Sequence, residues 1–267
     1  MCCGKNISTY GTIIVAILIA GGDSFVYGSE LADGQSGPSE FTYTALLAKR
    51  LGMSYYCAAQ PGYSNNAIRR TVMNACEQAQ EEIGLVSVTW SFLSRYEFKF
   101  DESWEQISAW SIIDNISDIK KDFSVDNPVV FDWHVSRLQE EKYRGISQYA
   151  KIFYHYIGTF EYWELYNSLN ELVMLQQYLQ LKNIPYLFTS VDHGMTNVDH
   201  FKNDITFKTL LKQLDRKNWM WFPVNLGFYE WAKENDYPFG TTHPLEPAHI
   251  DAEKIIYEYL RNISRVS

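Results

Sequence analysis

The stretch Gly11 to Gly28, GTIIVAILIAGGDSFVYG, decides the expected fold of this chain. Its β-branched and aliphatic residues show no polar alternation, which is typical of a strand covered on both faces of a parallel sheet. Gly21 and Gly22 permit a close turn after that strand. Asp23 and Ser24 should therefore stand at the carboxyl edge of the sheet, where open α/β sheets bind their ligands. A plain turn or helix cap is the alternative interpretation, because Asp and Ser are favoured there too.

Length and composition favour one large domain with a full core. A chain of 267 residues is ordinary for a single α/β domain with insertions. A hydrophobic content of 46%, with 16% aromatic residues, excludes a disordered chain. The 23 basic and 32 acidic residues give a net charge of −9, and a negative surface repels phosphate backbones. We therefore expect no nucleic-acid partner and, without a basic run, no membrane partner.

The cysteines and the N-terminus indicate a reducing compartment. The 4 cysteines lack the spacing of a zinc site, and the chain is too large for a disulfide scaffold. Residues 1–10 are interpreted as an ill-ordered leader. The apolar run from Ile13 to Ala20 is shorter than the roughly 20 residues that span a bilayer, and cleavage after it would remove the first strand. We expect a cytoplasmic protein.

Strands and helices alternate along the rest of the chain. Strands are predicted at 53–59, 85–90 and 184–190, with a short candidate at 219–222, and helices at 38–51, 66–82, 147–182, 204–214 and 247–262. This order predicts an α/β fold, a three-layer αβα sandwich with a mostly parallel, flavodoxin-like sheet.

We expect one domain over residues 1–267, with core blocks at 11–94 and 184–267. The aromatic-rich residues 95–145 are interpreted as an insertion or lid. Their aromatic side chains could line a substrate site or simply pack on the core.

Ser24 is the candidate nucleophile. A serine hydroxyl needs a base within hydrogen-bond reach and donors for a developing oxyanion. His243 lies in the loop Gly240 to Pro244, just before the last predicted helix, and such a loop returns to the sheet edge where Ser24 is expected. We therefore take His243 as the candidate base.

Three motifs, in chain order, resemble those of the SGNH (GDSL-type) hydrolase family. They are Gly22-Asp23-Ser24-Phe25, Gly62 followed by Asn65, and His243-Pro244. The resemblance extends over nearly the whole chain. It implies that Ser24 is the nucleophile and that backbone N–H groups of Ser24 and Gly62 hold the oxyanion.

The chain departs from the family pattern at two positions. The family places an oxyanion-donating asparagine where this chain has Ser91, so the Ser91 hydroxyl or the Asn65 amide would have to substitute. The family's aspartate, three residues before the histidine, is Gly240 here. Glu246 or Asp236 could then orient the imidazole, a backbone carbonyl could do so, or a Ser-His dyad could operate.

These patterns predict an esterase that cleaves a small-molecule or glycan ester, such as an acetylated sugar or a short acyl ester, without a cofactor. The same site could instead transfer the acyl group to an alcohol. The second hypothesis is a non-catalytic binding or structural module, for which Gly240 and Ser91 are the motivation. Nucleotide binding is less favoured, because no glycine-rich loop with a following lysine is present.

Several other polar residues have simpler interpretations. Asp23 is expected to tie down its loop, and His249 to be a structural histidine at a helix start. Arg95 could bind a substrate carboxylate or pair with Glu97 or another acid. His193 and its neighbour seven residues on, His200, lack a helical ligand spacing, so we predict no metal site.

Overall fold

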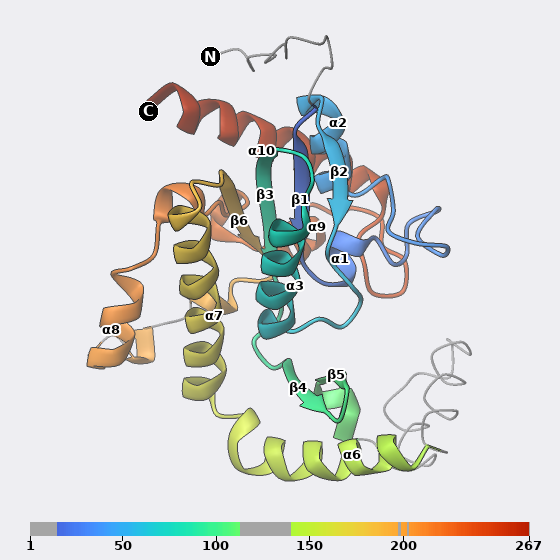
Figure 1. Ribbon diagram of the computed structural model, residues 1–267, viewed down its shortest axis with the longest axis vertical. Helices are drawn as coiled ribbons and strands as arrows, with labels where there is room; N and C mark the ends of the chain where they lie inside the picture. Colours follow the sequence, from blue (N-terminus) through green and yellow to red (C-terminus); the bar gives the residue numbers. More distant parts are fainter. Residues whose placement is uncertain (1–14, 113–139, 197–198, 202, 267) are drawn as a thin grey trace.

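The central sheet has four parallel strands in the order β2-β1-β3-β6 (Figure 1). The computed structural model describes residues 15–112, 140–196, 199–201 and 203–266. The strands are β1 (Ile17–Gly21), β2 (Ser54–Cys57), β3 (Ile83–Trp90) and β6 (Tyr186–Ser190). This is the flavodoxin-like order predicted from the sequence. The predicted leader, residues 1–10, lies outside the described residues.

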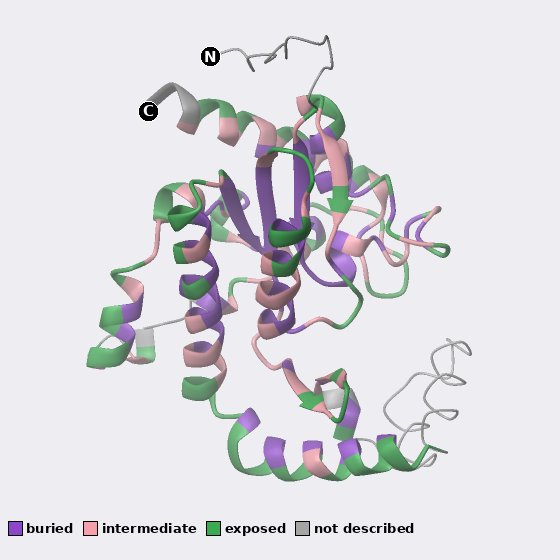
Figure 2. Cartoon of the chain, viewed as in Figure 1, coloured by how far each residue is buried: buried purple, intermediate pink, exposed green. Residues whose placement is uncertain are grey.

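Helices cover both faces of the sheet, as predicted for an αβα sandwich (Figure 1). One face carries α3 (Asn65–Gln78) and α7 (Glu161–Leu181), and the other carries α2 (Tyr43–Leu51) and α10 (Glu246–Val266). Side chains alternate across a strand, so β1 sends Leu18 to one core and Ile19 to the other. Figure 2 shows β1, β3 and β6 almost wholly buried.

In the described residues, two helices and a hairpin were not predicted, and one predicted strand is nearly absent. The additional elements are the short helix α1 (Ser24–Tyr27), the helix α9 (Phe228–Glu234) and a hairpin of β4 (Tyr96–Phe100) and β5 (Ser103–Ile107). The candidate strand 219–222 contributes a single parallel bridge, from Trp219 to Phe188. The predicted helix 204–214 is α8 (Ile205–Leu211).

Side-chain caps set where the helices on both faces begin. Thr42 accepts a hydrogen bond from the backbone N–H of Ala45, so α2 begins at Tyr43 and not at residue 38 as predicted. Ser64 caps α3 in the same way through the N–H of Ala67. Gly52, at a φ of 69°, ends α2 in the left-handed region that glycine favours.

The long helix predicted at 147–182 is interrupted. It consists of α6 (Glu141–Phe153), a π-helical turn η2 (Tyr154–Gly158) and then α7. Tyr154 is held by hydrogen bonds to the carbonyls of Ser94, at 2.6 Å, and Ile107, at 3.1 Å. These long-range bonds fix the turn where local periodicity predicted a continuous helix.

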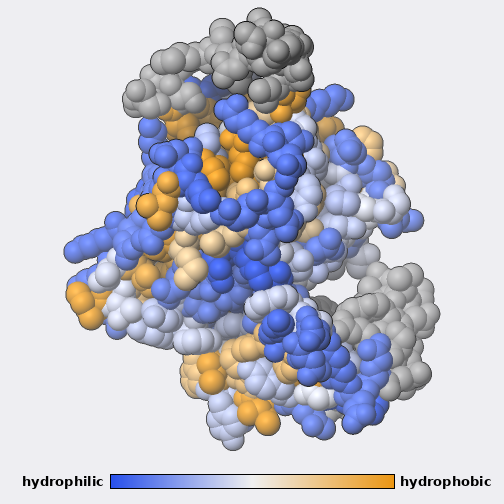
Figure 3. Space-filling model, viewed as in Figure 1, coloured by the Kyte–Doolittle hydropathy of each residue, from blue (hydrophilic) through white to orange (hydrophobic). Residues whose placement is uncertain are grey.

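The junction of α6 and α7 exposes apolar side chains. They include Ile152, Tyr156 and Phe160. Figure 3 shows hydrophobic surface at the lower edge of the molecule, in the region of this junction.

No described helix is both long enough and apolar enough to pass through a membrane.

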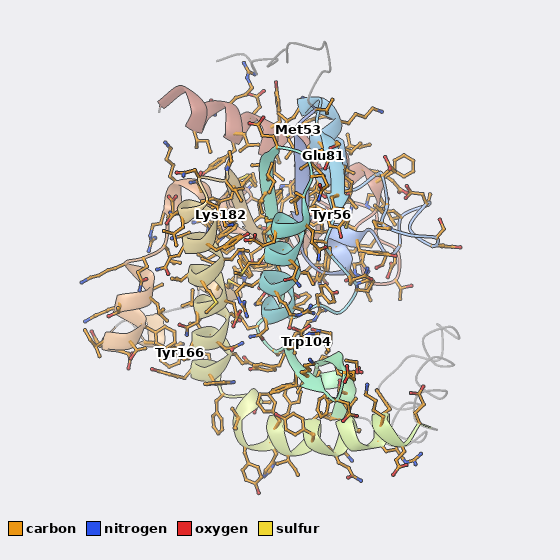
Figure 4. All side chains as sticks on the ribbon, viewed as in Figure 1. Met53, Tyr56, Glu81, Trp104, Tyr166 and Lys182 are labelled. Carbon is orange, nitrogen blue, oxygen red and sulfur yellow. The ribbon has the colours of Figure 1, made fainter. Side chains whose placement is uncertain are left out.

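The hairpin forms the start of the predicted insertion and is attached to α3. Arg70 binds the carboxylate of Glu97 through two nitrogens, at 2.8 and 2.5 Å, and its guanidinium lies 4.6 Å from the ring centroid of Trp104. Figure 4 labels Trp104 on this hairpin. Residues 113–139, which make up much of the predicted insertion, lie outside the described residues.

A substitution at the end of β1 tests how closely this strand packs on α3. A Cβ at Gly21 would lie 2.2 Å from Val72 Cγ2, so Gly21→Ala should lower the free energy of unfolding by about 1–3 kcal/mol. Val72→Ala removes the clashing methyl group, so the double variant should lose less than the sum of the two single losses. Urea unfolding of the four proteins measures this coupling, and additive losses would contradict the packing.

Candidate active site

The end of β1 delivers Ser24 into a capped turn. Asp23 is the N-cap of α1, and its Oδ1 accepts the backbone N–H of Phe25 at 3.1 Å. Gly28, at a φ of 79°, ends the helix after a single turn. A Cβ at Gly22 would lie 2.4 Å from Val26, so the close turn needs glycine there. The result is a buried serine, 7% exposed, at the carboxyl edge of the sheet.

His243 lies at the tip of a tight turn before α10. The N–H of Gly240 donates to the carbonyl of His243 at 2.9 Å, and the N–H of Leu245 donates to the carbonyl of Pro238 at 2.9 Å. The imidazole packs beside Phe25, with the ring centroids 4.6 Å apart. The turn therefore brings the imidazole against the residue that follows Ser24.

Ser24 and His243 are in hydrogen-bond contact. The Ser24 Oγ lies 2.7 Å from His243 Nε2, although the two residues are 219 positions apart. On the other side of the ring, Nδ1 lies 2.9 Å from Glu30 Oε1. A carboxylate at Nδ1 favours the tautomer with its proton on that nitrogen, so Nε2 is left to accept the Ser24 proton. This is the geometry that a general base requires.

The carboxylate beside the imidazole is Glu30, which corrects the prediction of Glu246 or Asp236. Glu246 Oε1 accepts the N–H of Ala32 at 2.9 Å, so it supports the Glu30 loop instead. Asp236 is exposed just beyond α9. Glu30 was not predicted from the sequence, where only its position six residues after Ser24 could have pointed to it.

Glu30 remains ionised under all ordinary conditions. Burial by itself would raise its pKa, but hydrogen bonds from His243 and Thr242 outweigh that effect and lower the pKa to about 2. Thr242 donates its Oγ1 proton to Glu30 Oε1 at 2.8 Å and its N–H at 3.1 Å. The site thus holds a fixed negative charge beside the imidazole.

Two predicted oxyanion donors have other partners. The Asn65 amide donates to the carbonyl of Ser91 at 3.2 Å and to Ser168 Oγ at 3.0 Å, which uses both of its hydrogens. The Ser91 hydroxyl donates to Asp23 Oδ2 at 2.7 Å. Both side chains therefore fix the loop after β3, in contrast to the oxyanion role predicted for them. Gly62 is exposed, with a φ of 82°, just before α3.

Asp23 ties down its loop, as predicted, through an ion pair. Arg95 Nη1 lies 2.7 Å from Asp23 Oδ2 and 2.9 Å from Ser91 Oγ. Of the two interpretations of Arg95, the ion pair is the one observed, but its partner is Asp23, since Glu97 binds Arg70. These bonds join the turn that carries Ser24 to the segment after β3.

His249 is a buried structural histidine, as predicted. It is 1% exposed, and its Nδ1 accepts the N–H of Tyr43 at 3.2 Å. Burial, together with the positive charge that His243 can carry, lowers its pKa to about 3, although a hydrogen bond with the backbone of Pro244 opposes this. A neutral His249 therefore links α2 to the residue after His243.

No group of described residues has the make-up of a metal site. In the described part of the chain, no three or more His, Cys, Asp or Glu side chains could hold a metal ion together. His193, one of the two histidines weighed as ligands, contacts Glu230.

Comparison with known proteins gives only distant structural similarities. No protein-family model matches the chain, and no curated protein matches it. Among solved structures, the chain is similar to the psychrotrophic esterase EstA from Pseudoalteromonas sp., with 12% identity, a TM-score of 0.45, and coverage of 92% of this chain and 97% of that one.

Two further structures are similar at the same level. One is the acetyl xylan esterase Est2A from Butyrivibrio proteoclasticus, with 14% identity, a TM-score of 0.46, and coverage of 94% of this chain but 65% of that one. The other is a member of the lipolytic G-D-S-L family from Veillonella parvula, with 12% identity, a TM-score of 0.38, and coverage of 88% and 92%. Identities of 12–14% make all three similarities distant.

The buried His249 makes stability depend on pH. Its pKa is about 3 in the folded protein against 6.5 as the ordinary value, so between these values unfolding takes up a proton and stability falls as the pH falls. Lowering the pH from 7 to 5 should therefore cost about 2 kcal/mol through this residue.

His249→Asn keeps an acceptor for the Tyr43 N–H but removes the titrating group. Urea unfolding at pH 7 and pH 5 should show a smaller pH-dependent loss in the variant than in the wild type, by about 2 kcal/mol. Equal losses in the two proteins would show that His249 does not stay neutral on folding.

Proposed function

We propose that this protein is a serine esterase that hydrolyses carboxylic esters. The observation that carries the proposal is the 2.7 Å contact between Ser24 Oγ and His243 Nε2, with a carboxylate at Nδ1. A serine hydroxyl is a poor nucleophile until a base removes its proton. The contact supplies that base, and the Glu30 carboxylate at Nδ1 favours the tautomer that accepts the proton at Nε2.

The reaction follows from these positions in two halves. In the first, His243 Nε2 takes the Ser24 proton while Oγ attacks the ester carbonyl, and the imidazolium returns the proton to the departing alkoxide, which leaves as an alcohol. In the second, His243 takes a proton from water, and the resulting hydroxide attacks the acyl-serine carbonyl. The carboxylic acid leaves and Ser24 regains its proton.

Backbone donors stabilise the oxyanion in this proposal. Ser24 is the first residue of α1, and the first N–H groups of a helix have no acceptor within it. Gly62, the second donor that the family resemblance implies, lies exposed where a Cβ would meet no atom within 4 Å. With Asn65 and Ser91 engaged elsewhere, the two main-chain N–H groups are the proposed pair.

The surroundings of Ser24 favour a short acyl group. Only 7% of the residue is exposed, and Phe25 packs against Phe92 and Tyr229, with ring centroids 6.2 and 6.0 Å away. A small acyl ester of a simple alcohol or of a sugar is therefore the proposed substrate class. The missing acid at Gly240 was one of the two reasons for considering a non-catalytic module. Glu30 supplies a carboxylate at His243 Nδ1 and so removes that reason.

Replacing the nucleophile tests the proposal. Ser24→Ala should lower kcat/KM for 4-nitrophenyl acetate by roughly 10³-fold or more, because Ser24 supplies the hydroxyl at Nε2 of the base, whereas the Thr242 hydroxyl contacts Nδ1 on the other side of the ring. Ser36→Ala, which changes an exposed serine six residues beyond Glu30, is the matched control and should retain full activity. Equal rates for Ser24→Ala and the wild type would remove the proposal.

A further inference from the structure

Position 240 is a glycine because the Glu30 carboxylate occupies the space of its side chain. A Cβ at Gly240 would lie 2.1 Å from Glu30 Oε2, 3.2 Å from its Cδ and 3.3 Å from its Cβ. Gly240 does not have one of the positive φ angles that favour glycine, which in the described glycines occur at Gly28, Gly52 and Gly62. The carboxylate, and not the backbone, therefore excludes a side chain there.

The Glu30 carboxylate is bound on the turn that carries His243. Besides Nδ1 of His243, it accepts the N–H and the hydroxyl of Thr242. Its own loop is folded tightly behind it, because a Cβ at Gly34 would lie 2.0 Å from the carbonyl of Gly28. Glu246, at the start of α10, fixes the same loop through the N–H of Ala32. Glu30 is thus delivered to the imidazole from a separate, anchored segment.

An aspartate at position 240 would place its carboxylate where the Glu30 carboxylate now lies. From a Cβ at this position, the carboxyl carbon of an aspartate lies about 1.5 Å further out. Its oxygens therefore fall in the volume that the Glu30 carboxylate now fills beside Nδ1. A carboxylate from residue 240 and one from residue 30 cannot both be present without displacement.

We propose that Glu30 is the positioning residue of His243 and that it holds a place interchangeable with a carboxylate on residue 240. The inference rests on the proposed hydrolysis at Ser24. Glu30 acts through the imidazole: it holds the proton on Nδ1 and stabilises the imidazolium that forms when Nε2 takes the Ser24 proton. The acid of the site is thereby supplied by the loop after the nucleophile and not by the turn that carries the base.

The charge of Glu30 is tested by an isosteric change. Glu30→Gln should lower kcat/KM for 4-nitrophenyl acetate by roughly 10³-fold, because an amide at Nδ1 no longer fixes the productive tautomer. The acid limb of the kcat/KM profile should also shift to lower pH by about 1 unit, because the imidazolium loses its counter-charge. Glu40→Gln removes an exposed carboxylate near the same loop and should change neither quantity.

Exchange of the acid between the two segments is the closing experiment. Glu30→Ala alone and Gly240→Asp alone should both have a lower kcat/KM than the wild type. The first lacks a carboxylate at Nδ1, and the second has two carboxylates competing for the same space. The double variant Glu30→Ala/Gly240→Asp should exceed Glu30→Ala in kcat/KM by about 10-fold or more and regain the wild-type acid limb. A double variant no more active than Glu30→Ala would overturn the exchange.

The outcome also separates this inference from the esterase proposal. If the wild type hydrolyses the ester through Ser24 while Glu30→Gln retains the wild-type rate and pH profile, only the role of Glu30 is overturned. If Ser24→Ala hydrolyses the ester as fast as the wild type, the esterase proposal fails, and the inference that rests on it fails too. Glu30→Gln preserves the shape of the side chain, so its result does not depend on whether the double variant folds.

Discussion

The hydrogen bond between Ser24 Oγ and His243 Nε2 is the interaction on which the site depends. It is 2.7 Å long and joins the end of the first strand to the turn before the last helix. It requires a glycine-tight turn that presents Ser24 and a carboxylate that holds the far side of the imidazole. Both supports lie in the connection between β1 and α2, whereas His243 precedes the last helix, so the site forms only when these two distant parts of the chain meet.

The parallel sheet provides that assembly. Because its strands run in one direction, the segments after β1, β3 and β6 all emerge at one edge. Arg95 and Ser91, after β3, bind Asp23 beside the nucleophile, and Asn65, at the start of α3, holds the main chain of Ser91. Asp23, Ser91 and Asn65 are therefore buried with partners, and these bonds hold the serine turn in place.

The sequence predicted those features that depend on local patterns. Uninterrupted apolar runs predicted the parallel strands, and Gly21 and Gly22 predicted the turn before Ser24. It failed where distant contacts decide the structure. The π turn at Tyr154 depends on carbonyls 47 and 60 residues away, and Glu30 meets His243 across 213 positions. Gly240 indicated that the usual acid is missing but not that Glu30 replaces it. The spacing of residues along the sequence does not show which loop occupies the space of a side chain at position 240.

Reactivity of Ser24 toward a fluorophosphonate tests the central claim most directly, because this reagent reacts with a serine that a base activates and needs no knowledge of the natural ester. The account predicts that the label maps to Ser24 in the wild type and that its second-order rate constant falls by at least about 10²-fold in His243→Ala. A label on Ser24 that forms equally fast in both proteins, or no label on Ser24 in the wild type, would contradict it.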